Sequence, residues 1–285
     1  MHFPYQHNLF EPWQQYQHPA VRQLAFAIAS PNILSCLPEN LDITHSFMLH
    51  DTKFWLQHYQ NYRFRLQQLD QCPTPLLNFL QQLKSTRLGL RFEMFIWFWL
   101  LENEYHPYQL LGHSIQKIAG PKTLGELDFL LLNTETQKVE HWEVALKYYL
   151  AEADFNLQYW YGLNRSDTLY RKLNHFTQKQ FQFTDALEHR IEQRYAVFKG
   201  QLYVPLRINY LLPHWVNTTR RLGQWGDKIP HADLQFYRLQ RHEWICADAQ
   251  TMNHTPIWWT DGLYRSAQND YYMFRSPPFL SQSNL

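Results

Sequence analysis

Apolar residues recur at helical spacing through the first part of the chain and form short extended runs further on. Proline interrupts the helical pattern after residue 30 and again near residue 73. The pattern predicts helices at residues 21–30, 51–70, 76–83 and 88–103. The last of them, LGLRFEMFIWFWLLEN, is apolar on nearly every side, which is typical of a buried helix.

Extended segments follow the buried helix. We predict strands over residues 108–120, 125–133 and 139–150, and the turn residues at 134–137 (TETQ) join the last two strands into a hairpin. A strand, a turn at Gly200 and a second strand are expected within residues 195–212.

A long helix is expected between these strands, over residues 166–191. It is indicated by one stripe of residues at helical spacing, formed by Leu169, Leu173, Phe176, Gln180, Phe183 and Leu187. Residues 213–285 are aromatic and interrupted by proline, and they give no clear pattern.

This order of elements indicates an α/β fold in a single domain of 285 residues. A helical lead-in covers residues 1–85, the core covers 86–212, and a C-terminal extension covers 213–285. Aromatic residues make up 17% of the chain, which excludes a disordered protein. The net charge of +1 excludes a globally basic nucleic-acid binder, and the 9 glycines form no phosphate-binding motif.

No segment predicts export or membrane insertion. The N-terminus lacks the charged and apolar stretches of a secretory signal, and the longest apolar run, at 94–101, is far shorter than the ~20 residues of a membrane span. The 3 cysteines form no metal-binding or disulfide pattern. We therefore expect a soluble, cytoplasmic protein without a membrane partner.

The predicted hairpin carries a pair of acids. If Asn133 faces Lys138 across the turn, Asp128 lies directly opposite Glu143, with both side chains on one face. That face also carries Glu126, Leu130, His141, Ala145 and Lys147, and the opposite, core face carries Leu127, Phe129, Leu131, Trp142, Val144 and Leu146.

Two carboxylates placed opposite each other repel, so another group must offset the repulsion. A shared proton with a raised pKa, a bound hard cation or a nearby basic side chain would each do so. The alternative is two solvated acids on an open face, with Lys147 paired to Glu126. Apolar runs such as FLLL beside Asp128 favour burial instead.

The buried helix adds a third acid, Glu93, and the long helix adds a polar residue, Gln180, to its apolar stripe. None of the neighbours of Glu93 one helical turn away is basic, so a buried Glu93 needs a partner from elsewhere, as a third acid of the site would. The alternative is that Glu93 reaches solvent at the helix edge or an arginine from a distant segment. Gln180 either bonds a group of the site or caps a strand carbonyl. The surrounding basic residues, which suit either phosphate contact or a solvated face, are Arg165, Arg171, Lys172, His175 and Lys179.

An acid on a helix, the strings GELDFLL and WEVALKYYL, and a helix with an inward glutamine together resemble the PD-(D/E)XK nuclease superfamily over residues 86–212. With RLGLRFEMFIWFWL and LNRSDTLYRKLNHFTQKQ, these strings are similar to an uncharacterised bacterial family of unknown function that is often grouped with those nucleases. The resemblance implies a restriction-endonuclease-like core, with a central mixed sheet flanked by helices. It also implies hydrolysis of DNA that depends on Mg²⁺ or Mn²⁺.

By position, the resemblance assigns the metal to Asp128 and Glu143 and an assisting role to Glu93. It assigns Lys147 to the attacking water or the phosphate, and Gln180 to support of the site. The candidate DNA contacts are then Arg165, Arg171, Lys172 and Lys179.

The chain departs from the superfamily motif at the lysine. The motif places lysine two residues after the acid, where this chain has Ala145. Lys147 lies two residues further along, at roughly 13 Å from Glu143 on a regular strand instead of roughly 6.6 Å. The proline of the motif is also absent, since Gly125, Glu126 and Leu127 precede Asp128.

Three functions fit this pattern. The first is a Mg²⁺-dependent deoxyribonuclease, and the second is a nucleic-acid-binding protein that has kept the fold without turnover. The third is a protein-interaction module. For this third function, the aromatic residues near the C-terminus serve either as partner anchors or as a buried cap on the sheet; they are Trp258, Trp259, Tyr271, Tyr272 and Phe274.

Overall fold

The structure, a computed structural model, describes residues 9–206, 211–230, 235–246, 259–266 and 270–276. Its α-helices are α1 (Pro19–Ala29), α2 (Thr52–Gln71), α3 (Thr74–Leu80), α4 (Leu88–Leu101) and α5 (Leu169–His175). The first four agree with the predicted helices to within a few residues at their ends. Side-chain caps begin three of the five: Asp51 caps α2 by accepting from the N–H of Phe54 at 2.8 Å, Thr168 caps α5 in the same way, and Nδ1 of His18 accepts from the N–H of Ala20 at the start of α1.

One mixed sheet organises the rest of the described chain. The strands are β1 (Tyr108–Ala119), β2 (Lys122–Asn133), β3 (Lys138–Ala151), β4 (Trp160–Tyr161), β5 (Asp185–Ala186), β6 (His189–Arg190), β7 (Gln193–Pro205), β8 (Gly223–Gly226), β9 (Phe236–Arg238), β10 (Gly262–Ser266) and β11 (Tyr271–Phe274). The sheet order is β1-β2-β3-β7-β8-β11-β10-β9, with β4 paired to β3 and with β5 and β6 in a separate hairpin. Strands β1 to β3 are antiparallel, whereas β3, β7, β8 and β11 pair in parallel.

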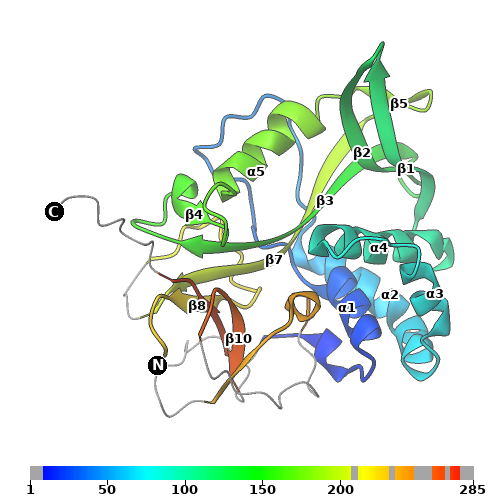
Figure 1. Cartoon of the computed structure of the whole chain (residues 1–285). Coiled ribbons are helices and arrows are strands. Elements are labelled where there is room, and N and C mark those ends of the chain that lie inside the picture. Colours follow the sequence, from blue (N-terminus) through cyan, green and yellow to red (C-terminus); the bar gives the residue numbers. More distant parts are fainter. Residues whose placement is uncertain (1–8, 207–210, 231–234, 247–258, 267–269, 277–285) are drawn as a thin grey trace.

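Helices cover both faces of this sheet, which confirms the predicted α/β class (Figure 1). On one face, α1, α2 and α4 share a core with the sheet, and Trp55 and Trp99 pack on Trp142 with ring centroids 6.1 and 6.4 Å apart. On the other face, α5 buries Leu169 and Leu173 completely. Alternate residues of β3 therefore face two different helical layers.

The register of the β2–β3 hairpin is the predicted one. Asn133 pairs with Lys138, and the ladder continues to Phe129 opposite Trp142. The core face is also confirmed, since Phe129, Leu131, Trp142 and Leu146 are buried beneath the helices. Leu127 is an exception, because it is buried in a separate cluster with Leu130 and Phe183.

The helix predicted over residues 166–191 is wrong beyond its first turns. α5 ends at His175, a π-helical turn covers Phe176–Gln180, and β5 and β6 follow. The buried hydroxyl of Thr177 accepts from two backbone N–H groups of the segment before α2, which anchors the turn to a distant part of the chain. Leu187, predicted on the buried stripe, is 51% exposed. Helical periodicity cannot show such a tertiary anchor.

The turn predicted at Gly200 within residues 195–212 is also wrong, because β7 runs through this position and pairs with β3 on both sides of it. Gly200 has a φ of +127° and lies against Lys147. A Cβ at Gly200 would lie 1.8 Å from the carbonyl oxygen of Lys147. The glycine therefore allows a close approach of two paired strands, not a reversal of the chain.

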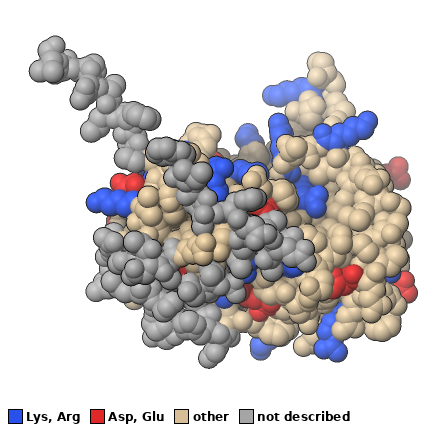
Figure 2. Space-filling view, turned by 60° about the horizontal axis from the view of Figure 1, so that its bottom comes forward, with Lys and Arg blue, Asp and Glu red and all other residues tan. Residues whose placement is uncertain are grey.

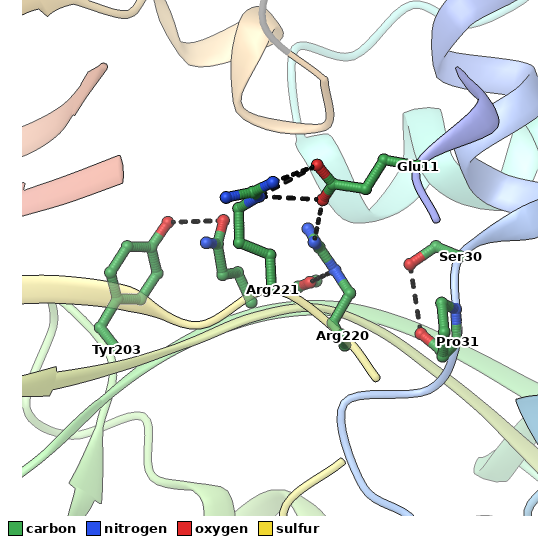
Figure 3. Close-up of polar contacts among 8 residues, drawn as sticks. Glu11, Ser30, Pro31, Tyr203, Arg220 and Arg221 are labelled. Atoms are coloured by element: carbon green, nitrogen blue, oxygen red, sulfur yellow. Dashed lines mark hydrogen bonds and ion pairs between the residues drawn. The ribbon is translucent and has the colours of Figure 1, made fainter. Parts of the chain in front are cut away.

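The same glycine is tied to the N-terminal segment through Arg220; Figure 3 shows Arg220 and Arg221 beside Glu11. The carbonyl of Gly200 accepts from Nε of Arg220 at 2.9 Å. Arg220 and Arg221 form ion pairs with Glu11, at 3.2 and 2.8 Å. Glu11 and both arginines are largely buried, so the pairs connect the start of the described chain to the β7–β8 connection.

The described aromatic residues of the C-terminal part follow the second of the two alternatives, a buried cap. Tyr272 and Phe274 are buried with Phe236 and Tyr264, and Trp259 packs against them. Tyr271 packs against the main core. Trp258 lies outside the described residues. Among the helices that the structure describes, none has the length and apolar character needed to cross a membrane.

Candidate active site

Asp128 and Glu143 lie together where β2 and β3 begin to separate. Beyond the pair formed by Phe129 and Trp142, carboxylates take the place of backbone partners. The N–H of Val144 donates to Oδ2 of Asp128 at 2.8 Å, and the N–H of Asp128 points at Oε1 of Glu143 at 3.4 Å. Glu143 is fully buried and Asp128 is partly buried. The two acids are therefore held in the sheet and not on an open face.

Burial dominates the electrostatics of this pair. Burial, followed by the charge of Glu143, raises the pKa of Asp128 well above its ordinary value. Burial raises the pKa of Glu143 to about 8, although Lys172 and hydrogen bonds with Asp128 lower it. Two such carboxyls retain a proton between them near neutral pH unless a cation replaces it.

His141 and Gln180 hold the two oxygens of Glu143. Nε2 of His141 lies 2.7 Å from Oε1, and Nε2 of Gln180 donates to Oε2. Burial, with a smaller effect of Arg194, lowers the pKa of His141 to about 3, so this histidine is neutral. The sequence placed His141 on the acid face, and of the two interpretations of Gln180 the structure shows contact with a site group.

Lys172 approaches the pair from α5. Its Nζ donates to Oε1 of Gln180 at 2.8 Å and lies 4.0 Å from the ring centre of Phe176. Burial lowers the pKa of Lys172, and the charges of Glu143 and Asp128 oppose this shift. Lys172, predicted as a phosphate contact, is thus a lysine whose charge acts on both acids.

Lys147 is engaged elsewhere. Its Nζ donates to Oδ2 of Asp167 at 2.7 Å, and the hydroxyl of Tyr149 donates to the other oxygen of Asp167 at 3.2 Å. Lys147 therefore pairs with Asp167 and not with Glu126, the partner that the open-face alternative supposed. The charge of Lys147 still contributes to the lowered pKa of Lys172, so the two ammonium groups belong to one neighbourhood.

Glu93 finds a partner that the sequence did not suggest. His113 of β1 lies with Nε2 at 2.7 Å from Oε1 of Glu93, and its ring stacks on Trp97 at 4.0 Å. The side-chain partner is therefore a histidine and not an arginine, and 17% of the Glu93 side chain remains exposed. The charge of Glu93 raises the pKa of both Asp128 and Glu143, which places it in the same acid cluster. The β1–β2 register shifts next to Gly112 and after Lys117, so strict alternation along β1 does not predict where His113 points.

The other basic candidates lie apart from the cluster. Arg165 binds both oxygens of Glu152, at 2.7 and 2.9 Å, and stacks on Tyr161. Arg171 donates to the carbonyl of Ser166, and Lys179 is exposed. Of the predicted DNA contacts, Lys172 joins the acids, whereas Arg171 and Lys179 keep most of their surface exposed.

The donors suit a small hard cation. Mg²⁺ is commonly bound through one or two carboxylates, with water and phosphate oxygens as its remaining ligands. Asp128 and Glu143 provide two such carboxylates, and burial, the main cause of their raised pKa values, disfavours their charged forms unless a cation lies beside them. Within the described ranges, no group of three or more His, Cys, Asp or Glu residues has a metal-binding arrangement. A cation here would therefore depend on water or on a bound phosphate.

The fold and the site define an α/β protein whose mixed sheet carries a carboxyl pair beside a lysine. The chain matches the model of a family described as a domain of unknown function (DUF1853) over residues 22–272, and it belongs to that family. No curated protein and no solved structure matches it.

Proposed function

We propose that this protein is a metal-dependent nuclease that hydrolyses phosphodiester bonds in DNA with a PD-(D/E)XK-like site. The observation that carries the proposal is the carboxyl pair of Asp128 and Glu143 beside Lys172 and Gln180. The order α4, β1, β2, β3, α5 and β7, with β3 and β7 in parallel, supports a restriction-endonuclease-like core.

Asp128 and Glu143 would hold Mg²⁺ or Mn²⁺, and Glu93 would add negative charge from α4. When bound, such a cation lowers the pKa of a coordinated water and neutralises charge on the phosphate. His141 and Gln180 fix the rotamer of Glu143, because each bonds one of its oxygens. The site is thereby pre-organised from two strands and the π-helical turn.

Lys172, in this proposal, fills the place that the resemblance gave to Lys147. Its ammonium group is positioned by Gln180 and influenced by both acids, whereas Lys147 is paired with Asp167. A fixed ammonium group stabilises the negative charge that develops on the phosphate. The lysine of this site thus comes from α5 and not from β3.

DNA would approach from the α5 side of the sheet, where Arg171 and Lys179 are exposed. Lysine and arginine side chains also gather on the projecting end of the molecule at the upper right of Figure 2, where the β1–β2 hairpin lies. Phosphate contacts of this kind position a duplex without reading its sequence.

One observation favours a second candidate, a DNA-binding protein without turnover. The lysine at the motif strand, Lys147, is neutralised by Asp167. If Lys172 does not take the role of Lys147, the acids would still bind a cation, and the protein would bind DNA without cleaving it.

The test is a calorimetric titration of Mg²⁺ and Mn²⁺, followed by cleavage assays on linear and supercoiled DNA. Asp128→Asn should abolish cation binding and lower cleavage by about three orders of magnitude or more. Asp185→Asn, at an exposed position, is the matched control. Cleavage that survives Asp128→Asn would refute the proposal, and cation-dependent DNA binding without product would favour the second candidate.

The two lysines separate the candidates further. Lys172→Met should lower cleavage about 100-fold while cation binding is retained, because one charge-stabilising donor is lost. Lys147→Met should have a smaller effect. A larger loss of cleavage in Lys147→Met than in Lys172→Met would assign the charge-stabilising role to Lys147 of β3.

A further inference from the structure

A second site lies on the opposite face of β3, away from the acid pair. A cavity of about 450 Å³ opens between α2, the β2–β3 turn and the start of β7. Its lining includes four rings and two acids, which are His50, Phe54, Tyr108, Tyr195, Glu135 and Glu140. Glu140 projects to this face because it is three positions from Glu143 along the strand.

Aromatic rings form one wall of the cavity. The ring of His50 is stacked between Phe54, at 3.7 Å and 6° from parallel, and Tyr195, at 3.9 Å and 9°. Tyr108 contributes a further ring from β1. Phe54 and Tyr195 are each only partly buried, so part of each ring faces the cavity. Such faces attract cations through the ring quadrupole.

The polar groups of the cavity are acidic or neutral. Glu140 is 2% exposed and its carboxylate accepts from Nδ2 of Asn133 at 2.9 Å and from Nε1 of Trp142 at 2.8 Å. Each oxygen has a second lone pair for a ligand. Glu135 adds another acid, and the described residues that line the cavity include no lysine or arginine, although the charge of Lys138 reaches Glu140. Burial lowers the pKa of His50 to about 2 and of His58 to about 4, so neither histidine adds a positive charge.

We propose that this cavity binds a planar organic cation of the guanidinium class. A guanidinium group stacks on aromatic faces and donates two parallel hydrogen bonds to a carboxylate, here Glu140. An anionic ligand such as a nucleotide is disfavoured by the two acids. The guanidinium belongs either to a free small molecule or to an arginine side chain of a partner polypeptide. This site is independent of the proposed nuclease activity, because it lies on the other face of the sheet.

The test uses the full chain and calorimetric titration with acetyl-arginine-amide and with acetyl-citrulline-amide, its uncharged isostere. We expect the arginine probe to bind with a Kd at or below about 1 mM and the citrulline probe at least about tenfold more weakly. Because both probes meet the wild-type protein, the comparison does not depend on a variant that folds. Equal affinities, or the absence of binding by the arginine probe, would overturn the proposal.

Variants locate the binding and distinguish the sources. Glu140→Gln should weaken the arginine probe about tenfold, whereas Glu104→Gln, at an exposed position, should leave it unchanged. Binding of the arginine probe but not of agmatine would identify a polypeptide source, and binding of agmatine would identify a free small guanidine. Tighter binding of adenosine monophosphate than of either cation would overturn the assignment of a cation site.

Discussion

Two buried glutamates of the same strand behave differently. Glu140 and Glu143 are three residues apart in β3 and are 2% and 0% exposed, on opposite faces of the sheet. Glu140 meets two neutral donors, the amide of Asn133 and the indole of Trp142. Glu143 meets a second carboxyl, Asp128, in addition to His141 and Gln180.

Burial alone therefore does not create a metal site. Burial raises the pKa of both glutamates, and hydrogen bonds from Asn133 and Trp142 lower that of Glu140 only in part, so it stays above its ordinary value. Asp128 and Glu143 place two acids in one small volume, and this pair needs a shared proton or a cation. The neighbouring side chains, more than the degree of burial, decide what each carboxylate can bind.

The strongest prediction is that replacing a single carboxylate by an amide, in Glu143 or in Glu140, removes one kind of ligand and leaves the other bound. Glu143→Gln should abolish binding of Mg²⁺ and lower DNA cleavage by about three orders of magnitude, and it should leave the arginine probe bound. Glu140→Gln should weaken the arginine probe about tenfold and leave Mg²⁺ binding and DNA cleavage unchanged. Calorimetry and a cleavage assay on both variants check this. If both variants lose the same ligand, the two faces are one site and the comparison fails.

A second prediction affects both sites together. Gly200→Ala should lower the free energy of unfolding by about 3 kcal/mol or more, because the new methyl group meets the carbonyl of Lys147 in β3 at a strained φ. Urea denaturation measures this change. Gly89→Ala is the control, since a Cβ there meets nothing within 4 Å and alanine favours the helix. A neutral Gly200→Ala would show that β3 and β7 do not approach as described.

The pH dependence of stability is a third way to test the acid pair. In the unfolded chain both acids lose their protons near pH 4, whereas the raised pKa values of Asp128 and Glu143 keep a proton in the folded state to higher pH. The folded state then binds more protons, so the free energy of unfolding falls as pH rises from about 4 to about 8. We expect Tm to fall between pH 5 and pH 8.

Calorimetric melting curves of Glu143→Gln should show a weaker fall of Tm with pH, and those of Glu104→Gln, at an exposed position, should show nearly the wild-type slope. Mg²⁺ should raise Tm more at pH 8 than at pH 5, because protons compete with the cation at the lower pH. An equal slope for wild type and Glu143→Gln would mean that the pair is not coupled.

The smallest expected effect concerns DNA contacts on the α5 side. Arg171→Gln and Lys179→Gln should each lower the slope of log affinity against log salt by about 1, with little effect on cleavage at saturating DNA. Fluorescence anisotropy at several salt concentrations measures the slope. Glu140→Gln serves as a control on the opposite face. Unchanged slopes for both basic variants would place the DNA elsewhere.

Patterns of local spacing were sufficient for part of this site. The turn residues at 134–137 and the alternation of the two strands set the register that brings Asp128 to Glu143, and they placed His141 on the same face. The apolar character of residues 88–103 predicted a buried helix and an acid in need of a partner. These features depend on neighbours within one hairpin or one helix, which the sequence displays directly.

Contacts between distant segments were not predictable in this way. The stripe from Leu169 to Leu187 suggested one long helix, and the anchor at Thr177 that ends it comes from a segment more than a hundred residues earlier. For the same reason Lys172 was assigned to phosphate contact, although the π-helical turn directs it through Gln180 to the acids.

The early helices, the hairpin register and the facing acids were thus predictable from the chain alone, because they follow from short-range periodicity. Their partners follow from the packing of distant segments: His113 for Glu93, Asp167 for Lys147 and Lys172 for the acid pair. That packing also decided that Gly200 lies within a strand. The physical reason is that burial and close approach are properties of the assembled layers, and they are not encoded in the spacing of neighbouring residues.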